Sequence, residues 1–533
     1  MGSSGRTCLR LAASATAVAL VVGSAAAADA RGGPRLEPRT HFTMAADGSS
    51  GATTKGAGIP NIDSVKSTIR TYYNATDGIA DKASSPYITE MNAIEDAARQ
   101  SLRSTYDDAV ANGETPAIVF DADDTTLWTY DMEDGAMKFN FDPILQNEWV
   151  QDERFPATPG MVDFVADAAD IGYEIFGITG RRNAQEPATI GNLEKVGYTE
   201  FDAANFYTKW DGPDSNRPAY VHCQAACTTV EYKAYTRAHI EHEGYDIVLN
   251  VGDQWSDLQG GHADEVLKLP NPTYYLPSPD LPRMNEPRLT PRTRFTMEPD
   301  GSSGRTEGGE GIPNIDSVKS TIRTYYNATD GIADKRHSPY ISEMKALAAR
   351  WAPKVRHTCA QLKSHHQRPA IVLDADDTTL WTYDMEDGAM KFNFDPALQN
   401  EWVQDQRFPA TPAMDRVVRA ARNHGCRIVG LTGRNDNQRH ATIANLNKWY
   451  DGAFKSRLYF TKWTGEGTSQ QPSYIHCAAA KCTTIEYKSQ TRKHIEKDLH
   501  LRIVANFGDQ FSDLIGGYAK RTYKLPNPTY YLP

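Results

Sequence analysis

The stretch DADDTTLWTYDMEDGAMKFNFDP runs from Asp121 to Pro143 and occurs again, unchanged, from Asp374 to Pro396. Each copy follows a short apolar run, residues 117–120 in the first and residues 370–373 in the second. An apolar run of this kind predicts a buried strand that ends at the carboxylates. Carboxylates so close together repel one another unless a cation or a shared proton stabilises them. The sequence therefore predicts two anionic sites, each at the end of a strand.

The similarity between the two halves of the chain extends well beyond this string. GIPNIDSVKSTIRTYYNATDGIADK begins at Gly58 and at Gly311, and KLPNPTYYLP begins at Lys268 and at Lys524. Each unit is about 240 residues long, which indicates a duplicated domain and not a solenoid of short repeats. We expect one domain over residues 40–277 and a second over residues 294–533. The polar, proline-rich residues 278–293 have the composition of a linker.

Composition and charge limit the possible partners. The chain has 533 residues, is 40% hydrophobic and carries a formal net charge of -11. It can bury large cores, and its negative charge argues against a nucleic acid polymer or an acidic membrane surface as a partner. A small anionic substrate would need a metal ion or a few well-placed cations. The sequence gives no indication of the oligomeric state.

The first thirty residues have the pattern of a cleaved secretory signal. Arg6 and Arg10 precede an apolar stretch over residues 11–22, and small residues follow over 23–30. No later segment is long and apolar enough for a membrane span, so we expect no stable membrane anchor. The mature protein is expected to be secreted, or periplasmic, depending on the host. Without Cys8, six cysteines remain, an even number that suits an oxidising compartment.

Helical and strand patterns alternate within each unit. In the first unit the expected helices span residues 61–73, 88–110, 184–196 and 228–242, and the expected strands span residues 117–120, 173–178, 205–208, 246–251 and 266–269. This alternation predicts an α/β fold with a mostly parallel sheet flanked by helices. Ligands bind such sheets at the carboxyl ends of the strands. The acidic cluster lies at one of these ends.

Four groups of polar residues follow strands or begin helices in each unit. In the first unit they are Asp121 and Asp123, then Thr179, Gly180 and Arg181, then Lys233, then Asp253 and Asp257; in the second they are Asp374 and Asp376, then Thr432, Gly433 and Arg434, then Lys488, then Asp509 and Asp513. A carboxylate can attack phosphorus and form an acyl phosphate. A hydroxyl and an ammonium can hold the phosphoryl oxygens, while magnesium neutralises charge shared between carboxylates. The order of residue types therefore indicates phosphoryl transfer.

These motifs, DxDxT, TGR, YKxxxR and GDQxxD in this order, resemble the haloacid dehalogenase superfamily. The resemblance is to its secreted acid phosphatases of subfamily IIIB, which are class B-like and related to plant vegetative storage proteins, and it covers nearly all of both units. It includes QNEWV at Gln146 and the KLPNPTYY ending of each unit. It implies a Rossmann-like fold with an N-terminal helical segment and a small cap, in two tandem copies. The implied cofactor is Mg²⁺, and the implied substrate is a small phosphomonoester.

The resemblance also implies a role for each site residue. It makes Asp121 and Asp374 the nucleophiles, Asp123 and Asp376 the general acid and base, and Thr179, Gly180, Arg181, Lys233, Thr432, Gly433, Arg434 and Lys488 the phosphate-binding groups. The implied metal ligands are Asp121, Asp123, Asp253, Asp374, Asp376 and Asp509, with Asp123 and Asp376 contributing backbone carbonyls. Asp257 and Asp513 would orient the lysine or a metal-bound water. Asp124 and Asp377 stand where many members of the superfamily have glycine or glutamate.

Several residues have alternative interpretations. The acidic string alone would also fit a solvated turn or a calcium loop. Lys233 fits a helix-surface lysine whose role Arg237 shares, and Arg181 fits either a phosphate-binding group or a structural salt bridge. The aromatic-rich residues 128–149 either line a pocket over the site or pack beneath an irregular loop.

The cysteines also allow more than one arrangement. Cys223 with Cys227, and Cys477 with Cys482, fit small disulfide loops better than a zinc site, because their spacings differ between the units. Cys359 and Cys426 have no counterparts in the first unit, where tyrosines occupy those positions, and they form a third candidate bridge. Asn74 and Asn327 fit the acceptor pattern for glycosylation, and a polar turn at a helix end explains them equally well.

The sequence thus predicts a secreted, magnesium-dependent acid phosphatase that acts through an aspartyl-phosphate intermediate at two active sites. One rival is a non-catalytic storage or phosphate-binding protein on the same fold. Another is a narrower nucleotidase, or a phosphotransferase that passes the phosphate to an alcohol.

Overall fold

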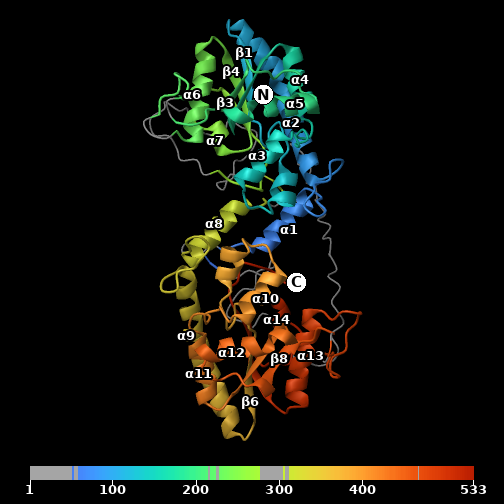
Figure 1. Ribbon diagram of the computed structural model, residues 1–533, viewed down its shortest axis with the longest axis vertical. Coiled ribbons are helices and arrows are strands. Elements are labelled where there is room, and N and C mark those ends of the chain that lie inside the picture. The colour runs from blue at the N-terminus through green and yellow to red at the C-terminus, as the bar shows by residue number, and fades with distance from the viewer. Residues whose placement is uncertain are drawn as a thin grey trace, which may run out of the picture.

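Two parallel five-stranded sheets form the centres of two lobes (Figure 1). This computed structural model describes residues 51–52, 58–213, 216–223, 227–276, 304–305, 311–465, 467 and 469–532. The predicted signal over residues 1–30 and the predicted linker over residues 278–293 lie outside the described residues.

The strands of each sheet are ordered so that the acidic string follows the central strand. The first sheet has the order β3-β2-β1-β4-β5, and the second has the equivalent order β10-β9-β6-β7-β8. The strands are β1 (Pro116–Phe120), β2 (Glu174–Arg182), β3 (Phe206–Lys209), β4 (Asp246–Gly252), β5 (Glu265–Lys268), β6 (Pro369–Leu373), β7 (Arg427–Asn435), β8 (Tyr459–Lys462), β9 (Arg502–Gly508) and β10 (Thr522–Lys524). All neighbouring strands pair in parallel. The predicted α/β fold in two copies is confirmed.

Helices cover both sheets. In the first unit they are α1 (Ile62–Tyr72), α2 (Pro86–Ala111), α3 (Pro143–Gln151), α4 (Met161–Ile171), α5 (Glu186–Val196), α6 (Thr229–His242) and α7 (Trp255–Leu258); in the second they are α8 (Ile315–Tyr326), α9 (Pro339–Ser364), α10 (Pro396–Gln404), α11 (Met414–Asn423), α12 (Arg439–Trp449), α13 (Thr484–Lys497) and α14 (Phe511–Leu514). Capping fixes several starts: the Asn61 side chain accepts from the backbone N–H groups of Asp63 and Ser64. Thr228 forms a capping box with Glu231 at the start of α6.

Between the first two strands the structure contains three helices that the sequence patterns did not predict. They are a π-helix over Asp131–Ala136, then α3 and α4. Asp142 caps α3 and Pro143 is its first residue, a start signal that the sequence does contain.

Most aromatic side chains of this segment are core residues. Trp128, Tyr130 and Phe139 are buried. The Trp128 ring lies 5.1 Å from that of Tyr87 on α2. Phe141, in contrast, is 69% exposed. The buried aromatic residues therefore pack in the core beneath this segment, which agrees with the packing interpretation and not with a pocket lining.

The two units exchange their N-terminal segments. Helices α1 and α8 lie between the lobes (Figure 1) and contact each other. Lys66 on α1 donates to the backbone oxygen of Phe392 in the second unit, and Lys319 on α8 donates to that of Phe139 in the first. At its other end α1 stays with its own unit, where Arg70 pairs with Asp134 at 2.7 Å. Each of these helices therefore bridges the two units.

All three predicted disulfides are present. They join Cys223 to Cys227, Cys477 to Cys482 and Cys359 to Cys426. The last bridge ties α9 to the start of β7. In the first unit the rings of Tyr106 and Tyr173 occupy the equivalent place, with their centroids 5.2 Å apart. The same junction is thus held by aromatic packing in one unit and by a covalent bond in the other.

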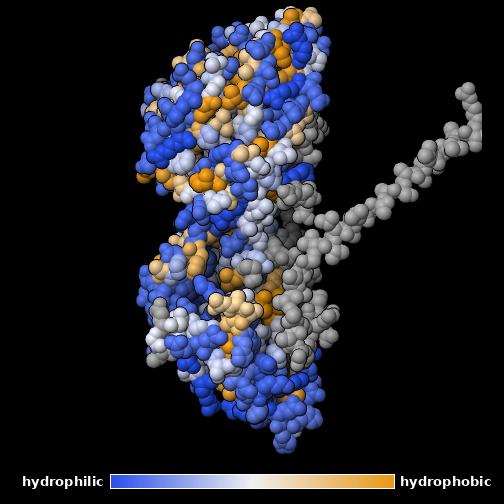
Figure 2. All heavy atoms as spheres, turned by 90° about the vertical axis from the view of Figure 1, so that its right-hand side faces the viewer, coloured by the Kyte–Doolittle hydropathy of each residue, from blue (hydrophilic) through white to orange (hydrophobic). Residues whose placement is uncertain are grey.

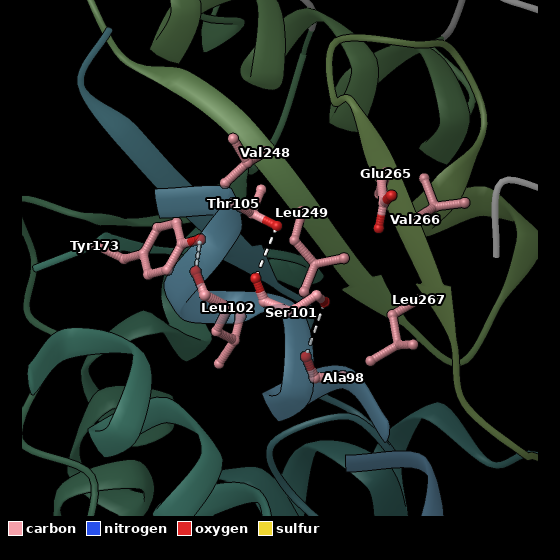
Figure 3. A pocket seen from close by; sticks show the side chains of 10 residues that line it. All are labelled: Ala98, Ser101, Leu102, Thr105, Tyr173, Val248, Leu249, Glu265, Val266 and Leu267. Atoms are coloured by element: carbon pink, nitrogen blue, oxygen red, sulfur yellow. Dashed lines mark hydrogen bonds between the residues drawn. The ribbon is translucent and has the colours of Figure 1, made fainter. Parts of the chain in front are cut away.

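A pocket in the first unit results from another difference in packing. It lies between α2 and the strands β4 and β5, and Ala98 and Leu267 are among its lining residues (Figure 3). The residue equivalent to Ala98 is Trp351, whose ring packs against those of Phe507 and Tyr523 at 5.7 and 5.2 Å. Since a core side chain fills the same place in the second unit, we regard this pocket as incomplete packing.

Hydrophilic residues cover most of the face shown in Figure 2, with small, dispersed hydrophobic areas. Among the described residues no helix combines the length and the apolar character that a membrane span requires.

One buried carboxyl group has no equivalent in the second unit. Glu95 on α2 is fully buried, and in the described part of the chain neither of its carboxylate oxygens has a hydrogen-bond partner. The nearest cation, the Arg99 guanidinium, lies 3.9 Å away. Burial raises the pKa of Glu95 to about 8. The equivalent residue is Ala348.

Glu95 should make the stability of the protein depend on pH. The unfolded state releases the Glu95 proton around pH 4.5, whereas the native state keeps it up to about pH 8. The free energy of unfolding therefore falls as pH rises between these two values. In the wild-type protein we expect the free energy of unfolding to fall by about 4 kcal/mol between pH 5 and pH 9 because of Glu95, and we expect Glu95→Ala to remove that fall. Urea unfolding at pH 5 and pH 9 measures it, with exposed Glu114→Ala as the control. Equal pH dependence in the Glu95→Ala and wild-type proteins would contradict the expectation.

Candidate active site

Two aspartates meet at the carboxyl edge of each sheet. Asp121 directly follows β1 and Asp253 directly follows β4, and these strands are neighbours. The backbone N–H of Asp121 donates to the Val251 carbonyl at 3.1 Å. Asp121 is 7% exposed and Asp253 is fully buried. Asp374 and Asp509 occupy the same positions after β6 and β9.

A buried lysine joins the first of these aspartates to a third. Lys233 on α6 donates to Asp121, and to Asp257 at 2.7 Å. In the second unit Lys488 donates to Asp374 at 2.9 Å and to Asp513. Burial disfavours the ammonium, but the two adjacent carboxylates outweigh it and raise the pKa of Lys233. Lys233 is therefore a buried, charged residue of the site and not a surface lysine.

Asp257 is fixed in place by its surroundings. Its second carboxylate oxygen accepts from the backbone N–H of Gln254 at 2.8 Å. A Cβ atom on Gly252 would lie only 2.5 Å from the Cβ of Asp257, so only glycine permits this close approach. Arg237 donates to the carbonyls of Asp257, Gln259 and Gly261. Arg237 thus holds the backbone around α7, and Lys233 alone of the two reaches the carboxylates.

Arg181 at the end of β2 pairs with Asp123. Its Nη2 lies 2.6 Å from one carboxylate oxygen of Asp123, and its Nε lies 3.2 Å from both. Another guanidinium nitrogen donates to Thr189 on α5 at 3.0 Å. Arg434 and Asp376 repeat this arrangement. Of the two interpretations of Arg181, the structure shows the salt bridge, and its partner is a residue of the site.

The Thr-Gly pair of β2 leaves room beside the carboxylates. The Thr179 hydroxyl accepts from the backbone N–H of Arg181 at 3.2 Å. A Cβ atom on Gly180 would meet only Thr229, at 3.7 Å, and one on Gly433 would meet nothing within 4 Å. An oxyanion can approach the backbone in such a space.

Asp124 supports the loop that carries Asp121 and Asp123. It has a positive φ of 49°, which its short polar side chain tolerates. Its carboxylate accepts from the backbone N–H and the hydroxyl of Thr129, at 3.0 and 2.5 Å, and from Asn271 at 3.2 Å. Burial raises the pKa of Asp124 to about 7. In the second unit Asp377 accepts from the equivalent residues, Thr382 and Asn527.

The C-terminal segment of each unit also belongs to the site, which the sequence analysis did not predict. Asn271 donates to Asp253 at 2.6 Å, and Asn527 donates to Asp509 at 2.8 Å. The Tyr530 hydroxyl also donates to Asp509, at 2.9 Å. The repeated KLPNPTYY was the available signal, but sequence alone could not place it beside the aspartates.

The carboxylates suit a divalent cation. Oxygen atoms of Asp121, Asp253 and Asp257 lie within 4.8 Å of one another, as do those of the equivalent trio Asp374, Asp509 and Asp513. Burial and the neighbouring carboxylates raise the pKa of Asp253 to about 8. Its Oδ1 is buried and has no hydrogen-bond partner within the described ranges. An all-oxygen set with an unsatisfied ligand atom fits a hard divalent cation.

One family model matches both units, over residues 62–277 and 333–533. Its description is HAD superfamily, subfamily IIIB (Acid phosphatase). The chain belongs to this family. The match in two regions agrees with the two sheets and with the predicted tandem copies.

Curated relatives of the HAD IIIB chain include a stem glycoprotein, a vegetative storage protein and an acid phosphatase. The stem 28 kDa glycoprotein of Glycine max is 33% identical over 30% of this chain and 59% of its own length. Vegetative storage protein 1 of Arabidopsis thaliana is 31% identical over 32% of this chain and 59% of its own length. The chain thus spans 59% of each of these two proteins. Acid phosphatase 1 of Solanum lycopersicum is 29% identical over 36% of this chain and 69% of its own length.

Among solved structures, the class C acid phosphatase from Bacillus anthracis is 22% identical to this HAD IIIB chain. The match covers 40% of this chain and 86% of the Bacillus anthracis chain, with a TM-score of 0.29.

Proposed function

We propose that the chain is a secreted acid phosphatase that hydrolyses small phosphomonoesters with Mg²⁺, at one active site in each unit. The observation that carries the proposal is the lysine that links two buried aspartates, Lys233 with Asp121 and Asp257, at the end of the central strand. The second unit repeats it with equivalent residues. The proposed domains are residues 40–277 and 294–533.

In the first step the Asp121 carboxylate attacks phosphorus. A bond forms between a carboxylate oxygen and phosphorus, and the bond from phosphorus to the ester oxygen breaks. Asp123 gives its proton to the departing alcohol. The Lys233 ammonium and the Thr179 hydroxyl hold the phosphoryl oxygens, and Arg181 orients Asp123 through the hydrogen bonds that it donates to the carboxyl group. The product of this step is an aspartyl phosphate on Asp121.

In the second step water releases the phosphate. Asp123, now a carboxylate, accepts a proton from the attacking water. The new bond from water to phosphorus replaces the bond to Asp121, so the free carboxylate and the protonated Asp123 are regenerated. Asp374, Asp376 and Lys488 would perform the same steps in the second unit.

Asp121 and Asp253, with the backbone carbonyl of Asp123, would hold the magnesium ion. When bound, the ion neutralises the charge that the phosphate adds to this acidic site. Asp257 bonds to Lys233 and orients it.

The proposal includes activity at acidic pH, because Asp123 must begin the reaction protonated and low pH favours that state. Secretion accords with the three disulfides, which form and persist in oxidising compartments.

Removal of divalent metal should abolish turnover. We expect a chelator to eliminate hydrolysis of para-nitrophenyl phosphate and added Mg²⁺ to restore it, since the carboxylates would otherwise repel the anionic substrate. Initial rates between pH 4 and pH 8 provide the measurement. If Mg²⁺ is present and the ester is not hydrolysed at a single pH in this range, the enzymatic function is refuted.

A storage or phosphate-binding role is the second candidate, favoured by the name of the Arabidopsis thaliana relative, vegetative storage protein 1. A protein of that kind would bind phosphate without turnover.

A further inference from the structure

The first residues of α8, in the second unit, hold the C-terminal segment of the first unit. The Asn314 side-chain amide donates to the carbonyls of Asn271 and Tyr274, at 3.1 and 2.6 Å. The backbone N–H of Ile315 donates to the Pro272 carbonyl at 2.9 Å. Asn314 is fully buried. Three residues of the segment Asn271–Tyr274 are thus attached to a helix of the second unit.

The first residues of α1 make the same contacts in the opposite direction. The Asn61 amide donates to the carbonyls of Asn527 and Tyr530, at 3.2 and 2.7 Å. The backbone N–H of Ile62 donates to the Pro528 carbonyl at 2.9 Å. The exchange between the units is therefore reciprocal.

In each unit an asparagine that is held in this way bonds directly to a site carboxylate. The backbone of Asn271 is held by Asn314, and its side chain donates to Asp253 at 2.6 Å. Asn527 is held by Asn61 and donates to Asp509 at 2.8 Å. Each asparagine of a helix start is therefore separated from a carboxylate of the other unit's site by a single residue.

We propose that each unit positions the active-site carboxylates of the other. Asn314 positions Asp253 of the first site, and Asn61 positions Asp509 of the second. Asn314 and Asn61 are positioning residues, since neither touches the carboxylates themselves. This inference rests on the proposed function for the identity of the sites, and it adds that neither unit forms a fully ordered site alone.

Substitutions in the complete chain can separate the two sites. A chain with Asp374→Asn retains only the first site, and a chain with Asp121→Asn retains only the second. Into each we would introduce either Asn314→Ser or Asn61→Ser. Serine still caps the helix, but it is too short to keep both bonds to the other unit. The measurements are the Mg²⁺ concentration for half-maximal hydrolysis and the dissociation constant for Mg²⁺ by calorimetry.

We expect each substitution to act on the opposite unit. Asn314→Ser should weaken Mg²⁺ binding several-fold, up to about tenfold, in the first-site chain, and leave the second-site chain within a factor of about two. Asn61→Ser should do the reverse. An effect confined to the substituted unit, equal effects on both sites, or no effect on either site would overturn the proposal.

A second pair of variants separates positioning from folding. Asn314→Asp and Asn61→Asp keep the size of the side chain and the helix cap but lose the amide donor, and the same crossed loss of Mg²⁺ affinity is expected. If the parent chains fail to hydrolyse phosphomonoesters, the proposed function fails, and calorimetry still decides whether the crossed effect on Mg²⁺ exists. If they hydrolyse the ester and the crossed effect is absent, only the positioning proposal fails.

Discussion

Replacing both Asp121 and Asp374 with asparagine should reduce kcat by a factor of at least about 10⁴. An amide of nearly the same shape fits the buried position, but it cannot form an acyl phosphate. Each single substitution should remove only the contribution of its own unit, because both units have the complete arrangement of lysine and aspartates. Steady-state hydrolysis of an aryl phosphate measures these effects.

The chain provides a matched control. Asp170 on α4 is exposed, and the equivalent residue of the second unit is Asn423. Asp170→Asn should therefore leave kcat unchanged. Retention of turnover by the double variant would contradict the nucleophilic role, whereas retained phosphate binding without turnover is the expected result. A wild-type chain that binds phosphate without turnover would favour the storage role.

Replacing both Lys233 and Lys488 with methionine should lower both activity and stability. Loss of an ammonium that stabilises developing charge costs about 10²–10³ in kcat. The substitution also leaves two buried carboxylates unpaired in each unit, at a cost of about 3–5 kcal/mol in the free energy of unfolding per unit. Aryl phosphate turnover and urea unfolding, each with saturating Mg²⁺, measure the two effects.

Lys195→Met is the control for this substitution. Its side chain is 56% exposed and lies 3.8 Å from Glu153, and exposed pairs contribute about 0–1 kcal/mol. Wild-type kcat in the Lys233→Met and Lys488→Met double variant would contradict the role of the lysine.

The strands and most helices could be predicted because their patterns are local. The apolar run before Asp121 and the capping residues of α1 and α6 lie within a few positions of the elements they define. The π-helix and α3 were missed because the aromatic residues 128–149 suggested a pocket lining or an irregular loop. Helix α4 begins after Gly160, with no capping side chain to mark its start. Burial of Trp128 and Phe139 beneath this segment depends on packing against distant residues.

The site could be predicted only in part. Parallel strands bring their carboxyl ends to one edge, so the grouping of Asp121, Thr179 and Asp253 follows from their places after strands. The bonds of Asn271 to Asp253, and of Asn314 to the backbone of Asn271, join residues far apart in sequence. No local pattern indicates that helix starts are exchanged between units, because that contact depends on how the two lobes meet.

We propose that the chain contains two complete sites, each of which forms an aspartyl phosphate. Acid quenching during turnover of an aryl phosphate, followed by peptide mapping with mass spectrometry, tests it directly. We expect phosphate on Asp121 and on Asp374 in the wild-type chain, on one of them in each single asparagine variant, and on neither in the double variant. Phosphate on only one of the two aspartates of the wild-type chain, or on other residues, would contradict it.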